Sequence, residues 1–273
     1  MKTRINLGTQ SHAFLGDTLD EAKANLIRNG FTYIQLSPPK ISKEICQDLS
    51  FDVKETAEYI IEKLKGLNIV AIGCYVNLCD ESGEATEKFL KYIELTAELG
   101  IKYICTETGK RDTLEETHSE ENYQRVKSNL KIISEYAQRK GVTVCIEMAY
   151  PHSIWNVDVL RRLLSEVDCP NIGCLFDPAG LMDKSNIENQ REIFDTYFDY
   201  FKDKIKFMHI KDVTFRDGSK KVTIPGKGDI DFEYLFKKIC EAFESIDIII
   251  DSPNEAFVLE TREAVRKYIQ EEN

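Results

Sequence analysis

The chain has 273 residues, and its 47 acidic residues outnumber its 36 basic ones, which gives a net charge of −11. Hydrophobic residues make up 42% of the sequence and charged residues 30%, a balance that excludes a disordered or a fibrous chain. The negative charge argues against nucleic acid or an anionic membrane as the main partner, because either would repel it.

Eight short runs of β-branched and aromatic residues have the length of strands. In chain order they are Thr3–Leu7, Thr32–Leu36, Ile69–Val76, Ile101–Thr106, Val142–Ile146, Ile172–Phe176, Ile205–Ile210 and Ile246–Ile250. Each run is followed by a stretch in which apolar residues recur with the period of a helix. These stretches are Asp17–Arg28, Val53–Lys65, Glu84–Leu99, Glu121–Arg139, Val157–Glu166, Gln190–Phe201, Phe232–Phe243 and Leu259–Ile269.

The alternation of strands and helices predicts the fold. It is typical of a parallel sheet, and eight units are the number that closes a (β/α)8 TIM barrel. We expect a single domain over residues 1–273, because no linker rich in Ser, Pro or Gly interrupts the chain. The alternative is an open doubly wound sheet, which would need a G-x-G-x-x-G turn after the first strand. Gly8 is instead followed by Thr9, Gln10 and Ser11, so the barrel is favoured.

The ends of the helical stretches support these boundaries. A glycine stands between a helix and the next strand at four places, where a left-handed residue ends a helix. These are Gly30, Gly66, Gly100 and Gly141.

Cysteine usage and hydropathy suggest a compartment. The eight cysteines are scattered and form no C-x-x-C pair. Several lie inside apolar runs, where free cysteine behaves as a small hydrophobic residue. We therefore expect no disulfide bonds and a location in the reducing cytoplasm. Neither a signal peptide nor a membrane helix is expected, since no apolar stretch is long enough.

The strand ends hold the residues that carry chemistry, because the active site of a TIM barrel lies at the carboxyl ends of its strands. Side chains alternate along a strand, so Glu147 shares the inward face with Cys145. The same count places Asp177, His209 and Asp251 inward at the ends of the next three strands. Any one of them can be a solvated strand end, but three converging carboxylates would repel one another without a cation. Together they predict one divalent ion, Mn2+, Mg2+, Co2+ or Zn2+.

Four further residues at this rim are candidates for binding a substrate. Lys211 lies two residues beyond His209, in the same inward phase, and Glu107 ends the fourth strand. His152 follows the fifth strand, and His12 follows the first strand just beyond Gln10. The alternative for Lys211 is a solvated lysine at the end of a strand, and the alternative for His152 is a histidine in a surface loop.

Three more features have two interpretations each. Trp155, the single tryptophan, either lines the pocket or packs against the next helix. His118 lies in an acidic stretch and is expected on the solvated surface. The turn at 226–228, Gly-Lys-Gly, either brings backbone N–H groups close to a ligand or is an ordinary turn before a helix.

Four motifs at the strand ends are specific enough to suggest a family. They are Cys145–Glu147, Leu175–Pro178, Met208–Asp212 and Pro225–Phe232. Together they resemble the xylose isomerase-like barrels, specifically the sugar phosphate isomerase/epimerase group, over essentially the whole chain. By position, the resemblance implies that Glu147, Asp177, His209 and Asp251 hold the metal ion, as a Glu, Asp, His, Glu set does in the ketose 3-epimerases of this group.

The chain departs from the pattern of that group at two positions. Asp251 stands where the group usually has a Glu that is both ligand and acid/base, and Asp is one methylene shorter. Glu255, which follows in the next loop, is a possible substitute. Many relatives have a His three residues after the Asp, where this chain has Gly180.

The resemblance implies a metal-dependent isomerase or epimerase of a small sugar, keto-sugar or related polyol carbonyl compound. A carbonyl oxygen and an adjacent hydroxyl oxygen would bind the metal, Glu147 would remove the proton between them to give an enediolate, and Asp251 would return a proton. Dehydration of the inosose type is an alternative on the same site. The non-enzymatic alternative is a sugar-binding barrel that has lost catalysis.

An abasic-site endonuclease of the same superfamily is disfavoured. That branch needs a three-zinc cluster rich in histidine, whereas this chain has four histidines and only His209 falls at a ligand position. The expected partner is therefore a small molecule, with neither nucleic acid nor membrane, and a homo-oligomer is left open.

Overall fold

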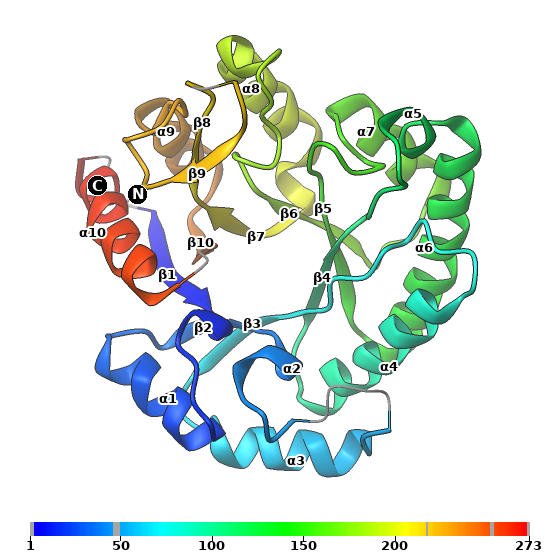
Figure 1. The fold of residues 1–273 in the computed structure, drawn as a ribbon, viewed down its shortest axis with the longest axis vertical. Helices are drawn as coiled ribbons and strands as arrows, with labels where there is room; N and C mark the ends of the chain where they lie inside the picture. The colour runs from blue at the N-terminus through cyan, green and yellow to red at the C-terminus, as the bar shows by residue number, and fades with distance from the viewer. Residues whose placement is uncertain (1–2, 46–49, 217, 252–253, 272–273) are drawn as a thin grey trace.

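A computed structural model describes residues 3–45, 50–216, 218–251 and 254–271. Within these residues, eight parallel strands close into a barrel in the order β1-β10-β7-β6-β5-β4-β3-β2, and helices surround it (Figure 1). The predicted (β/α)8 TIM barrel is confirmed, and the open doubly wound sheet is excluded. The barrel strands are β1 (Arg4–Gln10), β2 (Tyr33–Leu36), β3 (Asn68–Gly73), β4 (Tyr103–Glu107), β5 (Thr143–Glu147), β6 (Ile172–Phe176), β7 (Ile205–Ile210) and β10 (Ser245–Ile250).

Every predicted helix forms, with small shifts at its ends. The helices are α1 (Leu19–Arg28), α3 (Val53–Lys63), α4 (Glu84–Glu98), α6 (Glu120–Lys140), α7 (Val157–Val167), α8 (Gln190–Phe201), α9 (Phe232–Ala242) and α10 (Glu255–Glu271). A side chain at the N-cap position, such as Thr18 before α1 and Asp231 before α9, accepts a backbone N–H there. The four predicted C-terminal glycines all have a positive φ, for example +71° at Gly141.

Several short elements were not predicted, because three or four residues are too few to show a period. They are the helices α2 (Pro38–Ile41) and α5 (Leu114–Thr117), the 3-10 turns η1 (Ser11–Ala13), η2 (Ile187–Asn189) and η3 (Lys202–Lys204), and the antiparallel hairpin of β8 (Asp212–Thr214) and β9 (Lys221–Thr223). The hairpin follows β7 directly and therefore lies at the carboxyl end of the barrel.

Two hydrophobic clusters show which way each strand side chain points. One contains strand residues only, among them Cys105, Cys145, Leu175, Phe207 and Ile249, and fills the barrel interior. The other joins the alternate strand residues to the helices in one layer around the barrel. The predicted alternation is therefore confirmed in β5, β6, β7 and β10, and it continues into the residues that follow the strands.

Asp212 holds the turn at residues 226–230, which lies at the carboxyl end of the barrel strands. Its buried carboxylate accepts backbone N–H groups from Val213, Gly226, Gly228 and Ile230. A Cβ on Gly228 would lie 2.2 Å from Asp212 Oδ1, so the close approach requires glycine there. The N–H groups of Gly226 and Gly228 thus bind Asp212, and that of Lys227 binds the backbone oxygen of Ile224. All three N–H groups of the turn are used within the chain, which favours the interpretation as an ordinary turn before a helix.

Two negative findings bear on the predicted compartment. The described cysteines are all free thiols, and Cys46 lies outside the described residues. Within the part of the chain that the structure describes, no helix has both the length and the apolar character that crossing a membrane requires.

Candidate metal centre and active site

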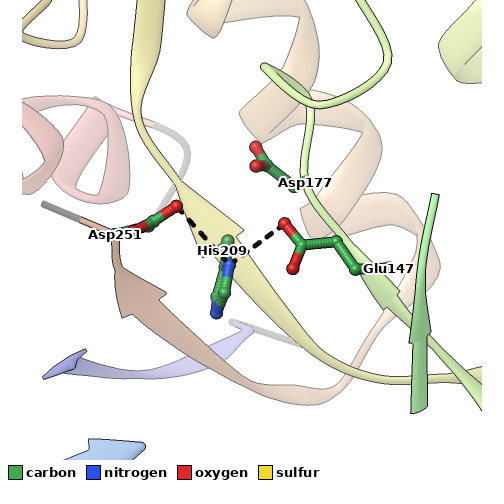
Figure 2. Close-up of side chains that lie close together, drawn as sticks. All are labelled: Glu147, Asp177, His209 and Asp251. Carbon is green, nitrogen blue, oxygen red and sulfur yellow. Dashed lines mark ion pairs between the residues drawn. The ribbon is translucent and has the colours of Figure 1, made fainter. Parts of the chain in front are cut away.

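Four neighbouring strands bring four potential metal ligands together at their carboxyl ends. Glu147 ends β5, Asp177 follows β6, His209 lies in β7 and Asp251 follows β10. One ligand atom from each lies within 4.8 Å of the others, and Figure 2 shows the four side chains converging. His209 Nδ1 lies 3.4 Å from a Glu147 oxygen and 3.8 Å from an Asp251 oxygen. The structure thus brings together the residues that the sequence singled out as metal ligands.

A glutamine that the sequence did not single out orients His209. Gln35 in β2 uses its amide Nε2 as donor to Tyr75 Oη at 3.0 Å and to Cys105 Sγ at 3.3 Å. Its Oε1 is therefore the acceptor for His209 Nε2, 2.5 Å away. The other ring nitrogen, Nδ1, is buried, faces the carboxylates and has no hydrogen-bond partner among the described residues. The sequence feature that could have identified Gln35 is a polar residue within an apolar strand, on the same face of the strand as Tyr33.

The donor set fits a divalent metal ion. Because His209 Nε2 donates to Gln35, Nδ1 is the ring nitrogen that faces the three carboxylates, as in metal-binding histidines. Burial would lower the pKa of His209, but Glu147, Asp251 and Asp177 raise it, so a metal ion at Nδ1 would take the place of a proton. Glu147 and Asp177 are also buried, so their ionised forms need a cation nearby to be stable.

Lys211 supplies one positive charge inside this cluster. Its Nζ lies 2.7 Å from Asp177 Oδ2 and also donates to Asp251 Oδ2. Burial alone would lower the pKa of Lys211, but the carboxylates of Asp177, Asp251 and Glu147 raise it well above its usual value. Lys211, predicted to bind substrate, therefore contacts two candidate metal ligands as an ammonium ion.

The three carboxylates among the candidate ligands differ in their protonation behaviour. Burial raises the pKa of Glu147 to about 7, and the nearby charge of Asp177 adds to this while His209 and Lys211 oppose it. Burial would also raise the pKa of Asp177, but Lys211 and His209 lower it to about 2. For Asp251, Lys211 and His209 likewise outweigh burial, so its pKa is lowered. Glu147 is thus the carboxylate best suited to accept a proton near neutral pH.

The other predicted substrate contacts lie around the cluster. Burial raises the pKa of Glu107, which is close enough to Asp177 and Asp251 to be affected by their charges. His152 Nε2 lies 3.9 Å from a Glu107 oxygen, and burial lowers the pKa of His152. Burial also lowers the pKa of His12, whose ring is within electrostatic range of Asp251. All three therefore lie at the rim as expected, and a role in substrate binding remains a prediction for each.

A cavity of about 570 Å³ lies at this end of the barrel and has an aromatic wall. Trp155 stacks on His118 with ring centroids 4.7 Å apart, and both rings line the cavity. His118 Nε2 also lies 3.2 Å from the backbone oxygen of His152. The expectation of a solvated His118 is therefore wrong, because α5 turns its ring toward Trp155. The cavity is completed by Tyr150, Lys184, Phe215 and Lys220, among others.

The structure bears on Glu255 and on Gly180, which the sequence singled out as departures from the pattern of the group. Glu255 begins α10, is exposed, and accepts a hydrogen bond from Asn29 Nδ2 at 3.2 Å. It lies at the surface with Asn29, so the expectation that it substitutes for Asp251 is wrong. A Cβ on Gly180 would lie 3.0 Å from the backbone oxygen of Met148, so a larger side chain there would require that segment to move.

Comparisons with known proteins agree with this arrangement. The sequence profile described as xylose isomerase-like TIM barrel matches residues 23–271. An inosose dehydratase of Serratia proteamaculans (strain 568) is 26% identical over 212 residues, which cover 68% of this chain and 70% of that protein.

Solved structures share the fold along the whole chain. A D-tagatose 3-epimerase-like protein superimposes with a TM-score of 0.75 at 16% identity, covering 98% of each chain. A structure described as IOLI protein with a binding zinc atom has a TM-score of 0.71 at 19% identity, covering 98% of this chain and 99% of that one.

Proposed function

Because the chain belongs to the xylose isomerase-like TIM barrel family, we propose that it is a divalent-metal-dependent isomerase or epimerase of a small sugar, keto-sugar or related polyol carbonyl compound. The observation that carries the proposal is the convergence of Glu147, Asp177, His209 and Asp251 on one point at the active-site end of the barrel. The expected partner is a small molecule, and the free cysteines support a reducing compartment such as the cytoplasm.

The metal would be held by these four side chains. When bound, a divalent ion would neutralise the carboxylates and polarise a carbonyl of the substrate, which acidifies the neighbouring C–H bond. His209 would contribute the nitrogen whose direction Gln35 fixes, and Asp177 would contribute a carboxylate of which Oδ1 already accepts the N–H of Ala179 at 2.9 Å.

Glu147 is the proposed base. It is buried at the inward end of β5 beside the other three candidate ligands, and burial raises its pKa to about 7 in the metal-free protein. Glu147 would take the proton from the carbon next to the carbonyl and leave the substrate as an enediolate. Asp251, across the cluster, would return a proton that it has first taken from solvent, because Lys211 and His209 keep its carboxylate ionised at rest, and Glu147 would release its own proton to solvent. Return to the opposite face of the same carbon gives an epimer, and return to the neighbouring carbon gives an isomer.

A second candidate is dehydration, which the inosose dehydratases among the sequence relatives favour. It begins with the same removal of a proton by Glu147, after which a hydroxyl on the adjacent carbon leaves as water. The two candidates differ in the product, because only dehydration lowers the mass by one water.

Incubation in D2O with added Mn2+ and a panel of keto-sugars and inososes tests the proposal. We expect deuterium at the reacting carbon by NMR, and Glu147→Gln should lower turnover by at least ~10²-fold, as loss of a general base does. Glu98→Gln, an exposed carboxylate at the end of α4, is the control and should match wild type.

Three results would count against the mechanism. Full activity of metal-loaded Glu147→Gln would exclude Glu147 as the base. Product without deuterium would indicate hydride transfer between carbons. Substrate binding without turnover across the panel would favour the sugar-binding barrel that has lost catalysis.

The metal site has its own test. Purified protein should carry or take up about one divalent ion per chain, and His209→Ala combined with Asp177→Ala should abolish this uptake while far-ultraviolet circular dichroism stays unchanged. Equal metal content in the double variant would show that the ion binds elsewhere.

A further inference from the structure

Lys211 contacts the same carboxylate oxygens that face the centre of the cluster. Asp177 Oδ1 is occupied by the N–H of Ala179, so Oδ2 is the atom available to a metal, and Lys211 Nζ lies 2.7 Å from it. Asp251 Oδ2 is the oxygen 3.8 Å from His209 Nδ1, and Lys211 donates to that atom too. The ammonium group therefore bridges two of the four candidate ligands.

We propose that Lys211 is a built-in counter-ion that competes with the divalent metal for Asp177 and Asp251, and that metal binding releases its ammonium group to bind a substrate oxygen. This inference rests on the proposed function for the position of the metal. An ammonium ion and a divalent ion on the same two oxygens would repel each other strongly at such short range. When the divalent ion binds these oxygens, the ammonium group must therefore leave them.

The charge balance favours a released ammonium group that stays beside the cluster. Glu147, Asp177 and Asp251 carry three negative charges when ionised, which one divalent ion and one ammonium group balance together. The lysine side chain is 18% exposed, so it borders the open side of the site. A released ammonium group at this place would be positioned to bind a hydroxyl or carbonyl oxygen of the substrate.

A neighbouring lysine provides a matched control. Lys220, next to β9, is affected by the charge of Asp177, yet it makes no ion pair with it among the described residues. Replacing Lys220 therefore removes a positive charge near the cluster without removing a contact to a candidate ligand. The difference between the two lysines separates direct competition from general electrostatics.

The affinity of the full chain for Mn2+, measured by competition with a chelating indicator, tests the inference. We expect Lys211→Met to bind Mn2+ at least ~10-fold more tightly than wild type, the low end of what one adjacent charge does to an ionic equilibrium. Lys220→Met should change the affinity less than ~3-fold. Without metal, Lys211→Met should melt at a lower temperature than wild type, because its buried carboxylates lose their partner, and Mn2+ should raise that temperature more than in wild type.

Equal or weaker Mn2+ binding by Lys211→Met would overturn the competition, and so would an equal gain in Lys220→Met. If Lys211→Met does not fold without metal, Lys211→Gln, which keeps a polar group, serves for the same comparison. In the Mn2+-loaded enzyme, Lys211→Met should raise KM more than it lowers kcat, and an unchanged KM would overturn the release of the ammonium group to the substrate.

The same measurement separates this inference from the proposed function. Tight binding by wild type without a gain in Lys211→Met contradicts the inference alone. Binding by Lys211→Met but not by wild type would mean that the lysine has replaced the metal, which supports competition and contradicts a metal-dependent activity. If neither wild type nor any variant binds Mn2+, both the inference about Lys211 and the proposed metal-dependent function are contradicted.

Discussion

Gln35 accepts a hydrogen bond from His209 Nε2 at 2.5 Å, and this contact leaves Nδ1 of the same ring facing Glu147. The two residues come from β2 and β7, which β1 and β10 separate in the closed barrel, so the contact crosses the interior. A buried amide whose own N–H groups bind Tyr75 and Cys105 can act toward His209 only as an acceptor. The ring is thereby held in the tautomer that a metal ligand needs.

Gln35→Met should lower Mn2+ affinity by about 10–100-fold, the usual cost of removing the partner of a metal-binding histidine. Gln35→Glu keeps an acceptor at the same place and should retain more affinity than Gln35→Met. Chelator competition measures both variants. Equal losses in the two would show that packing, and not the acceptor, is what matters.

The stability of the metal-free protein should depend on pH through Glu147. Burial raises its pKa to about 7 in the folded state, against about 4.3 in an unfolded chain. Between these values the folded protein binds a proton that the unfolded chain has lost, so stability falls as pH rises through this window.

Glu147→Gln has no such proton to lose. Without metal it should exceed wild type in free energy of unfolding by about 1–3 kcal/mol at pH 8, and by much less at pH 4.5. Urea unfolding in the presence of a chelator at both pH values measures the difference. A gap that stays constant with pH would rule out a raised pKa for Glu147.

Asp251 and Glu255 should differ sharply in their effect on activity. Asp251→Asn should lower turnover by at least ~10²-fold if Asp251 is the second acid/base. Glu255→Gln should leave turnover unchanged, because Glu255 is bonded to Asn29 at the surface. Steady-state kinetics at saturating Mn2+ compares the two, and a loss confined to Glu255→Gln would reverse the assignment.

Asp212→Ala should destabilise the fold by about 2–4 kcal/mol, because it leaves buried N–H groups of the following turn without an acceptor. Asp212→Asn retains one acceptor oxygen and should cost less. Thermal unfolding orders the two variants. If both matched wild type in melting temperature, Asp212 would not be what holds the turn at 226–230.

The barrel and its cluster could be predicted because both follow from local periodicity. The strand Ile172–Phe176 and the helix Gln190–Phe201 form with the predicted ends, since alternation and helical period set their boundaries. The same alternation carries Asp177 and His209 to the inward face. Convergence then follows from closure of the barrel, which places the ends of neighbouring strands side by side.

The contacts that depend on residues far apart in the sequence could not be predicted in this way. Gln35 and His209 are 174 positions apart, and nothing local in either strand indicates the other. The stacking of His118 on Trp155 depends on a four-residue helix that is too short to show a period. Lys211 was expected to face a substrate, and its pairing with Asp177 depends on distances between strands that a sequence pattern does not contain.

In the segment from His209 to Asp212, alternate residues make contacts on opposite faces of the chain. His209 and Lys211 point into the barrel toward the carboxylates, while Asp212 binds the backbone of the turn at 226–230. Deleting or inserting one residue here would turn the inward side chains outward and the outward ones inward. One such change would therefore displace the imidazole of His209, the ammonium group of Lys211 and the carboxylate of Asp212 together. Natural variation in length among proteins of this architecture should therefore be absent between these four positions, even where individual side chains are replaced.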